Sequence, residues 1–207
     1  YAIDRELTKM KSTTDMRPIM RKRINYPYFQ SYGHLTEASL HTLRQNFKNT
    51  PNTLMETTRL LREYQLDEDV AKLTPQIVAD YGQHDIQTHK PGTEFTEDNF
   101  TVLRDVFKPV YEEIAYMLSS PICRMRYATI QQNDDLEYHI DQPGKDRFVM
   151  VIDGEHVIHV KAKNDKQIKQ LMLPGELWYL NSNWEHRVEN TGSGLRLALL
   201  GCFDYNK

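Results

Sequence analysis

The pattern of hydrophobic and polar positions changes near Pro121. Before that residue, hydrophobic side chains recur at spacings of three and four, which is typical of amphipathic helices. After it, hydrophobic and polar residues alternate with a period of two, which is typical of strands that bury one face. We therefore predict a helical part over residues 36–118 and a β core over residues 119–207.

Two short helices are expected early in the helical part. Thr36 is a suitable N-cap for the first, because its hydroxyl can accept a hydrogen bond from the first turn. The hydrophobic face of this helix consists of Leu40, Leu43 and Phe47. The second helix is indicated by the spacing of Leu54, Leu61 and Tyr64.

The clearest helical pattern covers Glu97–Leu118. Its hydrophobic residues step by three and four: Phe100, Leu103, Phe107, Val110, Ile114 and Met117. We expect Thr96 to be its N-cap and Pro109 to kink it, because proline removes a backbone donor inside a helix.

Eight short strands are expected after Pro121. Turn residues separate them, and Asp153-Gly154 is a strong signal for a hairpin. The predicted strands are Ile122–Gln131, Leu136–Ile140, Arg147–Ile152, Glu155–Lys161, Gln167–Leu173, Glu176–Asn181, Glu185–Asn190 and Gly194–Phe203. Short strands at this spacing predict a sandwich or barrel, and the absence of strand–helix alternation argues against a doubly wound sheet. We expect an α+β protein with a mainly β core, in one domain over residues 1–207.

Composition narrows the classes of partner. The net charge of -3 disfavours nucleic acid, and no apolar run is long enough for a transmembrane helix, so no membrane partner is expected. Cys123 and Cys202 make no disulfide framework, which favours a reducing cytoplasm as the location. The sequence does not predict the oligomeric state.

Candidate chemistry lies in the β part. His139 and Asp141 are two residues apart on one predicted strand, so both side chains can point to the same face. His186 begins a later strand. Two histidines and one carboxylate form the facial ligand set of non-haem Fe(II) oxygenases, which leaves coordination positions open. The His-x-Asp pair alone carries little weight, because eight histidines and 29 acidic residues predict about one such pair by chance.

Arg196 adds a second observation, because it interrupts a hydrophobic strand ten residues after His186. A buried arginine needs an anionic partner, since burying its charge unpaired costs several kcal/mol. A dicarboxylate cosubstrate would supply that partner through a bidentate pair.

His-x-Asp, the distal histidine and the arginine ten residues beyond it resemble the 2-oxoglutarate- and Fe(II)-dependent oxygenases. The stretch from about Arg124 to Phe203 is similar to the aspartyl/asparaginyl β-hydroxylase group, which includes the bacterial proline cis-4-hydroxylases. The resemblance implies a double-stranded β-helix of the jelly-roll or cupin kind. The related mammalian aspartyl hydroxylases lack the carboxylate ligand, so Asp141 points to the amino-acid hydroxylase branch.

The resemblance also implies roles for residues. Fe(II) would be held by His139, Asp141 and His186, with 2-oxoglutarate and O2 as cosubstrates. Arg196 would bind the distal carboxylate of 2-oxoglutarate, and Arg147 is a second anion-binding candidate on the strand that resembles the arginine-bearing strand of the family. The family histidine two residues after that arginine is replaced by Val149, which puts the cosubstrate contacts in doubt.

Three further residues are candidates for substrate contact: Arg124, Arg126 and Trp184. Each also has an ordinary interpretation, as a solvent-exposed arginine or a packing aromatic. The expected substrate is a free amino acid, or else an amino-acid residue of a peptide or protein. His156 and His159 are expected to lie at the surface or to be hydrogen-bonded, outside any metal site.

Two other functions stay open. The turn at Pro174-Gly175, with His186 and Asn190, resembles the second motif of cupins, which suggests a cupin-type metalloenzyme that does not use 2-oxoglutarate. A non-catalytic β-barrel that binds a ligand is the third possibility, with the triad as an accident of composition.

Overall fold

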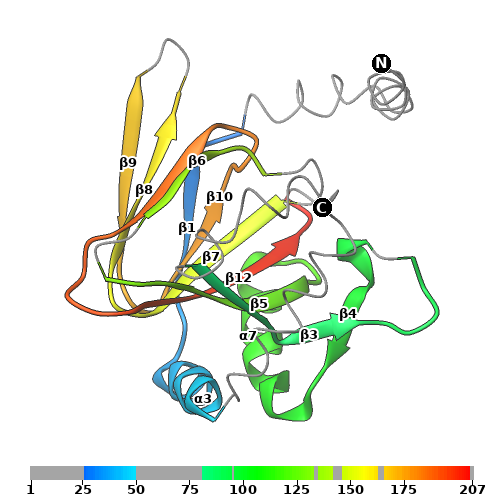
Figure 1. Cartoon of the computed structure of the whole chain (residues 1–207). Helices are drawn as coiled ribbons and strands as arrows, with labels where there is room; N and C mark the ends of the chain where they lie inside the picture. Colours follow the sequence, from blue (N-terminus) through cyan, green and yellow to red (C-terminus); the bar gives the residue numbers. More distant parts are fainter. Residues whose placement is uncertain are drawn as a thin grey trace, which may run out of the picture.

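A computed structural model describes residues 26–49, 81–94, 96–132, 135–141, 146–162 and 166–205, with the backbone alone for 81–85 (Figure 1). Within these ranges the chain is built mainly of β-strands that pair antiparallel. The predicted mainly β core with accompanying helices is therefore confirmed. None of the helices described there is long and apolar enough to cross a membrane.

Two large sheets carry most of the described strands. The six-stranded sheet has the order β1 (Phe29–His34), β10 (Glu176–Leu180), β7 (Asp146–Asp153), β12 (Arg196–Phe203), β5 (Cys123–Ile130) and β2 (Tyr81–Asp85). The four-stranded sheet has the order β6 (Asp135–His139), β11 (His186–Asn190), β8 (His156–Lys161) and β9 (Gln167–Met172). Successive strands from β5 to β12 pass back and forth between the sheets, except for the β8–β9 hairpin.

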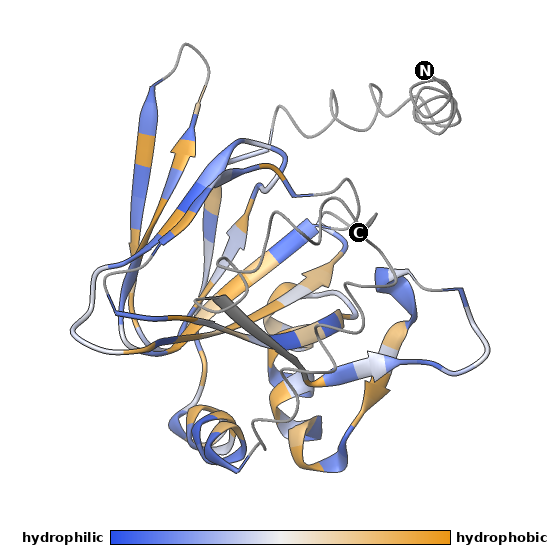
Figure 2. Cartoon of the chain, in the orientation of Figure 1, coloured by the Kyte–Doolittle hydropathy of each residue, from blue (hydrophilic) through white to orange (hydrophobic). Residues whose placement is uncertain are grey.

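All eight strands predicted after Pro121 are present within about two residues of their expected ends. Figure 2 shows hydrophobic and hydrophilic residues mixed along β9, an edge strand of the four-stranded sheet. Every second residue of β9 is the less exposed one, because successive side chains of a strand point to opposite sides of the sheet.

The six-stranded sheet buries both faces. On one face, Phe148, Met150 and Ile152 of β7 belong to a core that includes residues of both α-helices that the structure describes. On the other face, Val149 and Val151 belong to a second core with residues of the four-stranded sheet. The centre of the molecule between the two sheets is therefore a hydrophobic layer, and polar groups placed there need partners.

The helix α3 (Glu37–Lys48) begins as predicted. The Thr36 hydroxyl accepts a hydrogen bond from the Ser39 backbone N–H at 3.4 Å, and Leu40 and Leu43 are buried. The predicted helix with Leu54, Leu61 and Tyr64 lies outside the described residues.

The prediction of one helix over Glu97–Leu118 is wrong in its first half. That half forms the short 3-10 turns η1 (Glu97–Asn99) and η2 (Asp105–Phe107), with strand β4 (Phe100–Leu103) between them. Strand β4 pairs with β3 (Gln87–His89), and this pairing overrides the local helical spacing. Only α7 (Lys108–Leu118) is helical, and Pro109 lies in its first turn, where proline is tolerated, instead of kinking it.

Candidate metal centre

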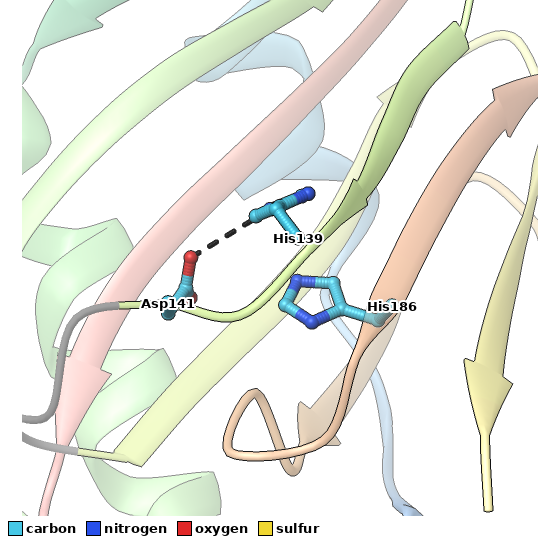
Figure 3. Close-up of side chains that lie close together, drawn as sticks. All are labelled: His139, Asp141 and His186. Carbon is cyan, nitrogen blue, oxygen red and sulfur yellow. Dashed lines mark ion pairs between the residues drawn. The ribbon is translucent and has the colours of Figure 1, made fainter.

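Three predicted ligands lie together between the sheets. The possible ligand atoms of His139, Asp141 and His186 are all within 4.8 Å of one another. His139 ends β6, His186 begins β11, and the two are directly opposite in the antiparallel pairing of these strands. Asp141 follows β6, where its backbone N–H donates to the Ser182 carbonyl at 3.3 Å. Figure 3 shows the three side chains converging from the two neighbouring strands.

Backbone carbonyls orient both imidazole rings. His139 Nδ1 lies 2.7 Å from the Glu137 carbonyl oxygen, and His186 Nδ1 lies 2.9 Å from the Trp184 carbonyl oxygen. A hydrogen on each Nδ1 satisfies these contacts and leaves each Nε2 lone pair for a cation. His139 Nε2 lies 3.7 Å from Asp141 Oδ1.

The electrostatics favour the protonation states that a cation needs. Burial lowers the pKa of His186, and the neighbouring His139 and Arg147 lower it further, while Asp141 opposes the shift. Burial alone would raise the pKa of Asp141, but the charge of Arg147 and the two histidines outweigh it and lower that pKa. A neutral imidazole and an ionised carboxylate are the forms that bind metal.

Arg147 joins the ligand Asp141 to a second carboxylate. Its Nε donates to Asp141 Oδ2 at 3.1 Å, and its Nη1 donates to Glu97 Oε2 at 2.8 Å. Its Nη2 lies 2.8 Å from Glu97 Oε1, so the pair with Glu97 is bidentate. Arg147 is thus engaged by two carboxylates of the chain itself, one of which is the ligand candidate Asp141.

A cavity of about 250 Å³ opens beside the three ligands. Apolar side chains line most of it, together with three arginines: Arg126, Arg147 and Arg196. All three arginines come from the six-stranded sheet, whereas both histidines come from the four-stranded sheet. The cavity therefore has candidate metal ligands on one wall and positive charge on the other.

Arg196 is 2% exposed and is therefore almost completely inside the protein. Its Nε lies 3.3 Å from His156 Nδ1, and its Nη2 lies 3.4 Å from His156 Nε2. Burial lowers the pKa of His156 well below its usual value, and the charge of Arg196 adds to that shift. His156 therefore stays neutral beside the guanidinium and adds no charge of its own to this wall.

The three residues predicted to contact the substrate lie in different places. Arg126 lines the cavity, where its buried Nε has no hydrogen-bond partner among the described residues. Arg124 lies away from the cavity wall, with its Nη1 2.7 Å from Glu97 Oε1. Trp184 packs edge-on against Tyr28, with ring centroids 5.4 Å apart, which matches its packing interpretation.

His156 and His159 lie outside the candidate ligand cluster, but neither is at the surface. Both are buried, and His159 Nε2 lies 2.7 Å from Glu189 Oε2. The expectation that each would be at the surface or hydrogen-bonded is met by hydrogen bonding in both cases, because His156 accepts from Arg196 and His159 contacts Glu189.

Glu97 is the residue that the sequence did not single out. The predicted helix Glu97–Leu118 begins with this residue, and an acidic side chain in the first turn of a helix is common and indicates no particular function. In the structure it bridges Arg124 and Arg147. Only the tertiary position of η1 against β5 brings it there, and no local sequence signal encodes that contact.

No protein-family profile matches the chain, and no curated protein matches it. Solved structures of oxalate decarboxylase, including Bacillus subtilis variants, are similar over 40% of this chain and 22% of theirs, with 20% identity and a TM-score of 0.35. A structure of Drosophila melanogaster CENP-C bound to CAL1 is similar over 37% of this chain and 58% of its own, with 10% identity and a TM-score of 0.34. The chain thus spans about a fifth of the oxalate decarboxylases, and likenesses this slight assign no activity.

Proposed function

We propose that the protein is an Fe(II)- and 2-oxoglutarate-dependent oxygenase that hydroxylates an unactivated C–H bond. One observation carries the proposal. His139, Asp141 and His186 converge on one wall of a cavity whose opposite wall carries Arg126 and Arg196. A cosubstrate with a chelating end and a distal carboxylate matches both walls, because it can reach a metal and a guanidinium together.

The topology is consistent with this proposal. We interpret the passage of successive strands between the two sheets as a double-stranded β-helix, in which eight strands form a jelly roll. In this interpretation β1 and β2 extend the larger sheet at its two edges. Residues 1–207 then form one catalytic domain, with the helices packed on the outer face of the larger sheet.

The donor set fits a divalent iron centre, because two imidazoles and one carboxylate leave positions open for cosubstrate and O2. When bound together, Fe(II), 2-oxoglutarate and O2 supply the oxidising power for hydroxylation, with succinate and CO2 as the coproducts. His139 and His186 would hold the metal through Nε2, and Arg147 would keep Asp141 ionised and oriented.

Other residues of the cavity would bind 2-oxoglutarate and the substrate and would exclude water. Arg196 would take the distal carboxylate of 2-oxoglutarate, with neutral His156 limiting the positive charge around it. Arg126, on the same wall, would offer a second guanidinium to a carboxylate of the substrate. The apolar residues of the wall would keep bulk water from the reacting atoms. An amino acid or an amino-acid residue of a peptide is the substrate class that we propose on the family resemblance.

The first experiment is anaerobic titration of the metal-free protein with Fe(II) and then 2-oxoglutarate. We expect the weak visible charge-transfer band of a bidentate keto-acid chelate. His186→Ala should lose the metal and the band, whereas Arg196→Lys should keep the metal and bind 2-oxoglutarate about tenfold or more weakly, because the bidentate fork is lost. His159→Ala is the matched control, since this buried histidine contacts Glu189 and lies outside the ligand cluster.

A cupin-type metalloenzyme that does not use 2-oxoglutarate is the second candidate. The same three ligands suit Mn(II) as well as Fe(II), and Mn(II) centres are described for an oxalate decarboxylase that resembles part of the chain. Asn190 does not strengthen this interpretation, because its Nδ2 donates to the carbonyls of Ile130, Gln131 and Gly194 and so fixes a turn. Tight binding of Mn(II), with turnover of oxalate and no response to 2-oxoglutarate, would favour the second candidate.

A further inference from the structure

The two cysteines of the chain lie directly opposite each other. Cys123 begins β5 and Cys202 is near the end of β12, and the two are partners in the antiparallel pairing of these strands. Directly opposite residues in antiparallel strands have Cα atoms about 4.5–5.5 Å apart, which is within the range that a disulfide spans. Neither cysteine is in a disulfide, and both are buried. A separation of 79 positions in the sequence hides this proximity.

The two thiols interact, and one of them is activated. A hydrogen bond from Cys123, together with the charges of Arg147 and Arg126, lowers the pKa of the Cys202 thiol to about 7, against the opposing effect of burial. Arg147 Nη1 lies 2.6 Å from Cys202 Sγ. A thiolate is the reactive form of cysteine, and a neighbouring cation stabilises it.

One guanidinium connects this pair to the candidate metal centre. Arg147 contacts Cys202 and Glu97 through Nη1, and it donates to the metal-ligand candidate Asp141 through Nε. Any change in the charge on Cys202 therefore acts on the group that holds Asp141. The path from Cys202 to Asp141 runs through a single side chain.

A second cavity gives access to the pair from the other side. This cavity has a volume of about 610 Å³, and its lining includes Cys123 and the charged residues Arg104, Lys108 and Asp204. Cys202 is 0% exposed. Arg147, which contacts Cys202, lines the other cavity, the one beside the candidate metal ligands. A small polar oxidant can thus approach Cys123 without entering the candidate active site.

We propose that Cys123 and Cys202 are a redox-active pair that closes to a disulfide under a peroxide and thereby changes the hold of Arg147 on Asp141. The effect on metal binding rests on the proposed metal centre, whereas the formation of the disulfide does not.

The reaction is a two-electron oxidation by hydrogen peroxide. The Cys123 thiol gives up its proton and its sulfur attacks a peroxide oxygen, so that an S–O bond forms and the O–O bond breaks. The hydroxide that leaves takes up that proton and becomes water. The Cys202 thiolate then attacks the sulfenic sulfur of Cys123, an S–S bond forms and the S–O bond breaks, and the hydroxide that leaves takes a proton from solvent to become a second water. The two cysteines are oxidised by two electrons and one peroxide is reduced to two waters.

Oxidation removes negative charge from the surroundings of Arg147. A disulfide sulfur carries no negative charge, so Arg147 loses an anionic acceptor and its positive charge is left to Asp141 and Glu97. A less compensated cation beside the ligand carboxylate weakens the binding of another cation. We expect the oxidised protein to bind the metal about tenfold more weakly, the lower end of the range for disturbed outer-shell partners.

The first test uses the whole, reduced, metal-free protein. After treatment with hydrogen peroxide, the protein is alkylated under denaturing conditions and weighed by intact mass spectrometry. We expect both thiols to disappear together with a loss of two hydrogen atoms, and dithiothreitol to restore them. The two matched controls differ: Cys202→Ser should stop at a sulfenic acid on Cys123, and Cys123→Ser should keep the buried Cys202 thiol. Thiols that stay alkylatable, oxidise separately or form only intermolecular disulfides would overturn the pair.

The second test measures the coupling without and with metal. In the metal-free protein, the NMR signal of the Arg147 Nε–H, assigned by its loss in Arg147→Lys, should shift on oxidation. In a Mn(II) titration, the oxidised protein should bind about tenfold more weakly than the reduced protein, with no such difference in Cys123→Ser. An unchanged Nε–H signal or equal affinities would overturn the coupling. If the reduced protein binds no metal, the proposed function fails, and the mass and NMR results still decide the redox pair.

Discussion

Arg147 is the buried residue on which two half-buried carboxylates depend. Its side chain is 10% exposed and satisfies Glu97 and Asp141 together. Removing one member of a buried ion pair leaves the other charge uncompensated, which costs more than the loss of a surface pair.

Arg147→Gln should therefore lower the free energy of unfolding by about 3–5 kcal/mol, as measured by urea denaturation of the metal-free protein. Arg124→Gln is the matched control, because Arg124 also pairs with Glu97 but leaves it the bidentate contact with Arg147. The control should lose about 1 kcal/mol or less. Equal losses in the two variants would contradict the central role of Arg147.

His156 predicts a dependence of stability on pH. Burial and the charge of Arg196 keep its pKa in the folded state well below 6.5. As the pH falls below about 6.5, the unfolded chain takes up a proton at this histidine and the folded chain does not. The free energy of unfolding should then fall by up to about 1.4 kcal/mol per pH unit, while the contribution is fully present above pH 6.5. His156→Gln should show a smaller slope in urea denaturation between pH 6.5 and pH 5, and an unchanged slope would contradict the assignment.

The sequence predicts the candidate ligands better than their partners. His-x-Asp, His186 and Arg196 carry a recognisable spacing, and the structure brings all four to one cavity. The contacts of Arg147 with Glu97 and Cys202 were not predictable, because they depend on where η1 and β12 lie in space.

Among the elements, α3 and α7 are joined by one acidic side chain. The Glu113 carboxylate of α7 accepts hydrogen bonds from the Thr36 backbone N–H at 2.7 Å and from the Thr36 hydroxyl at 3.0 Å, and it also accepts one from the Ser39 hydroxyl. The carboxylate lies at the N-terminus of α3, where the helix dipole favours negative charge.

Glu113→Gln should lower the free energy of unfolding by about 1–2 kcal/mol, the scale of a lost helix cap. Glu112→Gln, at an exposed position on the same helix, should change it by less than about 0.5 kcal/mol. Thermal unfolding followed by circular dichroism measures both. A variant of Glu113 as stable as the control would show that the contact between the helices contributes nothing.

Strand β12 needs a glycine at the position where it pairs with Phe148 of β7. A Cβ on Gly201 would clash with the Phe148 ring on the paired strand. Gly201→Ala should therefore lower the free energy of unfolding by about 1–3 kcal/mol through overpacking. Gly194→Ala is the control, since its Cβ would meet nothing within 4 Å. Urea denaturation compares the two, and equal stabilities would contradict the clash.

The prediction of elements succeeded where turn residues bound short hydrophobic segments. The eight strands after Pro121 are of this kind, and β5, β7 and β12 are buried almost throughout because their sheet is covered on both faces. Strands β1 and β3 escaped prediction, since short polar segments such as Gln87–His89 carry little periodicity. The Glu97–Leu118 error arose because Phe100, Leu103 and Phe107 fit a helical spacing, whereas the pairing of β4 with β3 decides the conformation.

At the scale of the whole molecule, the two sheets contribute different kinds of residue to the candidate site. The four-stranded sheet carries the histidines and the six-stranded sheet carries the three arginines of the cavity. Any change in the distance between the sheets would alter the span between the candidate ligands and the guanidinium groups. The hydrophobic layer between them, which includes Val149, Ile158 and Val188, therefore sets that span.

The position of β6 at the margin of its sheet has a kinetic consequence. Among the described strands, β6 pairs with β11 alone, and His139 and Asp141 sit at its end. Fraying of this one strand would withdraw two of the three ligands in a single event. The dissociation rate of the ion would then be set by local opening and not by stepwise ligand loss. Metal should accordingly slow amide hydrogen exchange in β6 far more than in β9, and escape of the ion and exchange of those amides should share one rate-limiting motion.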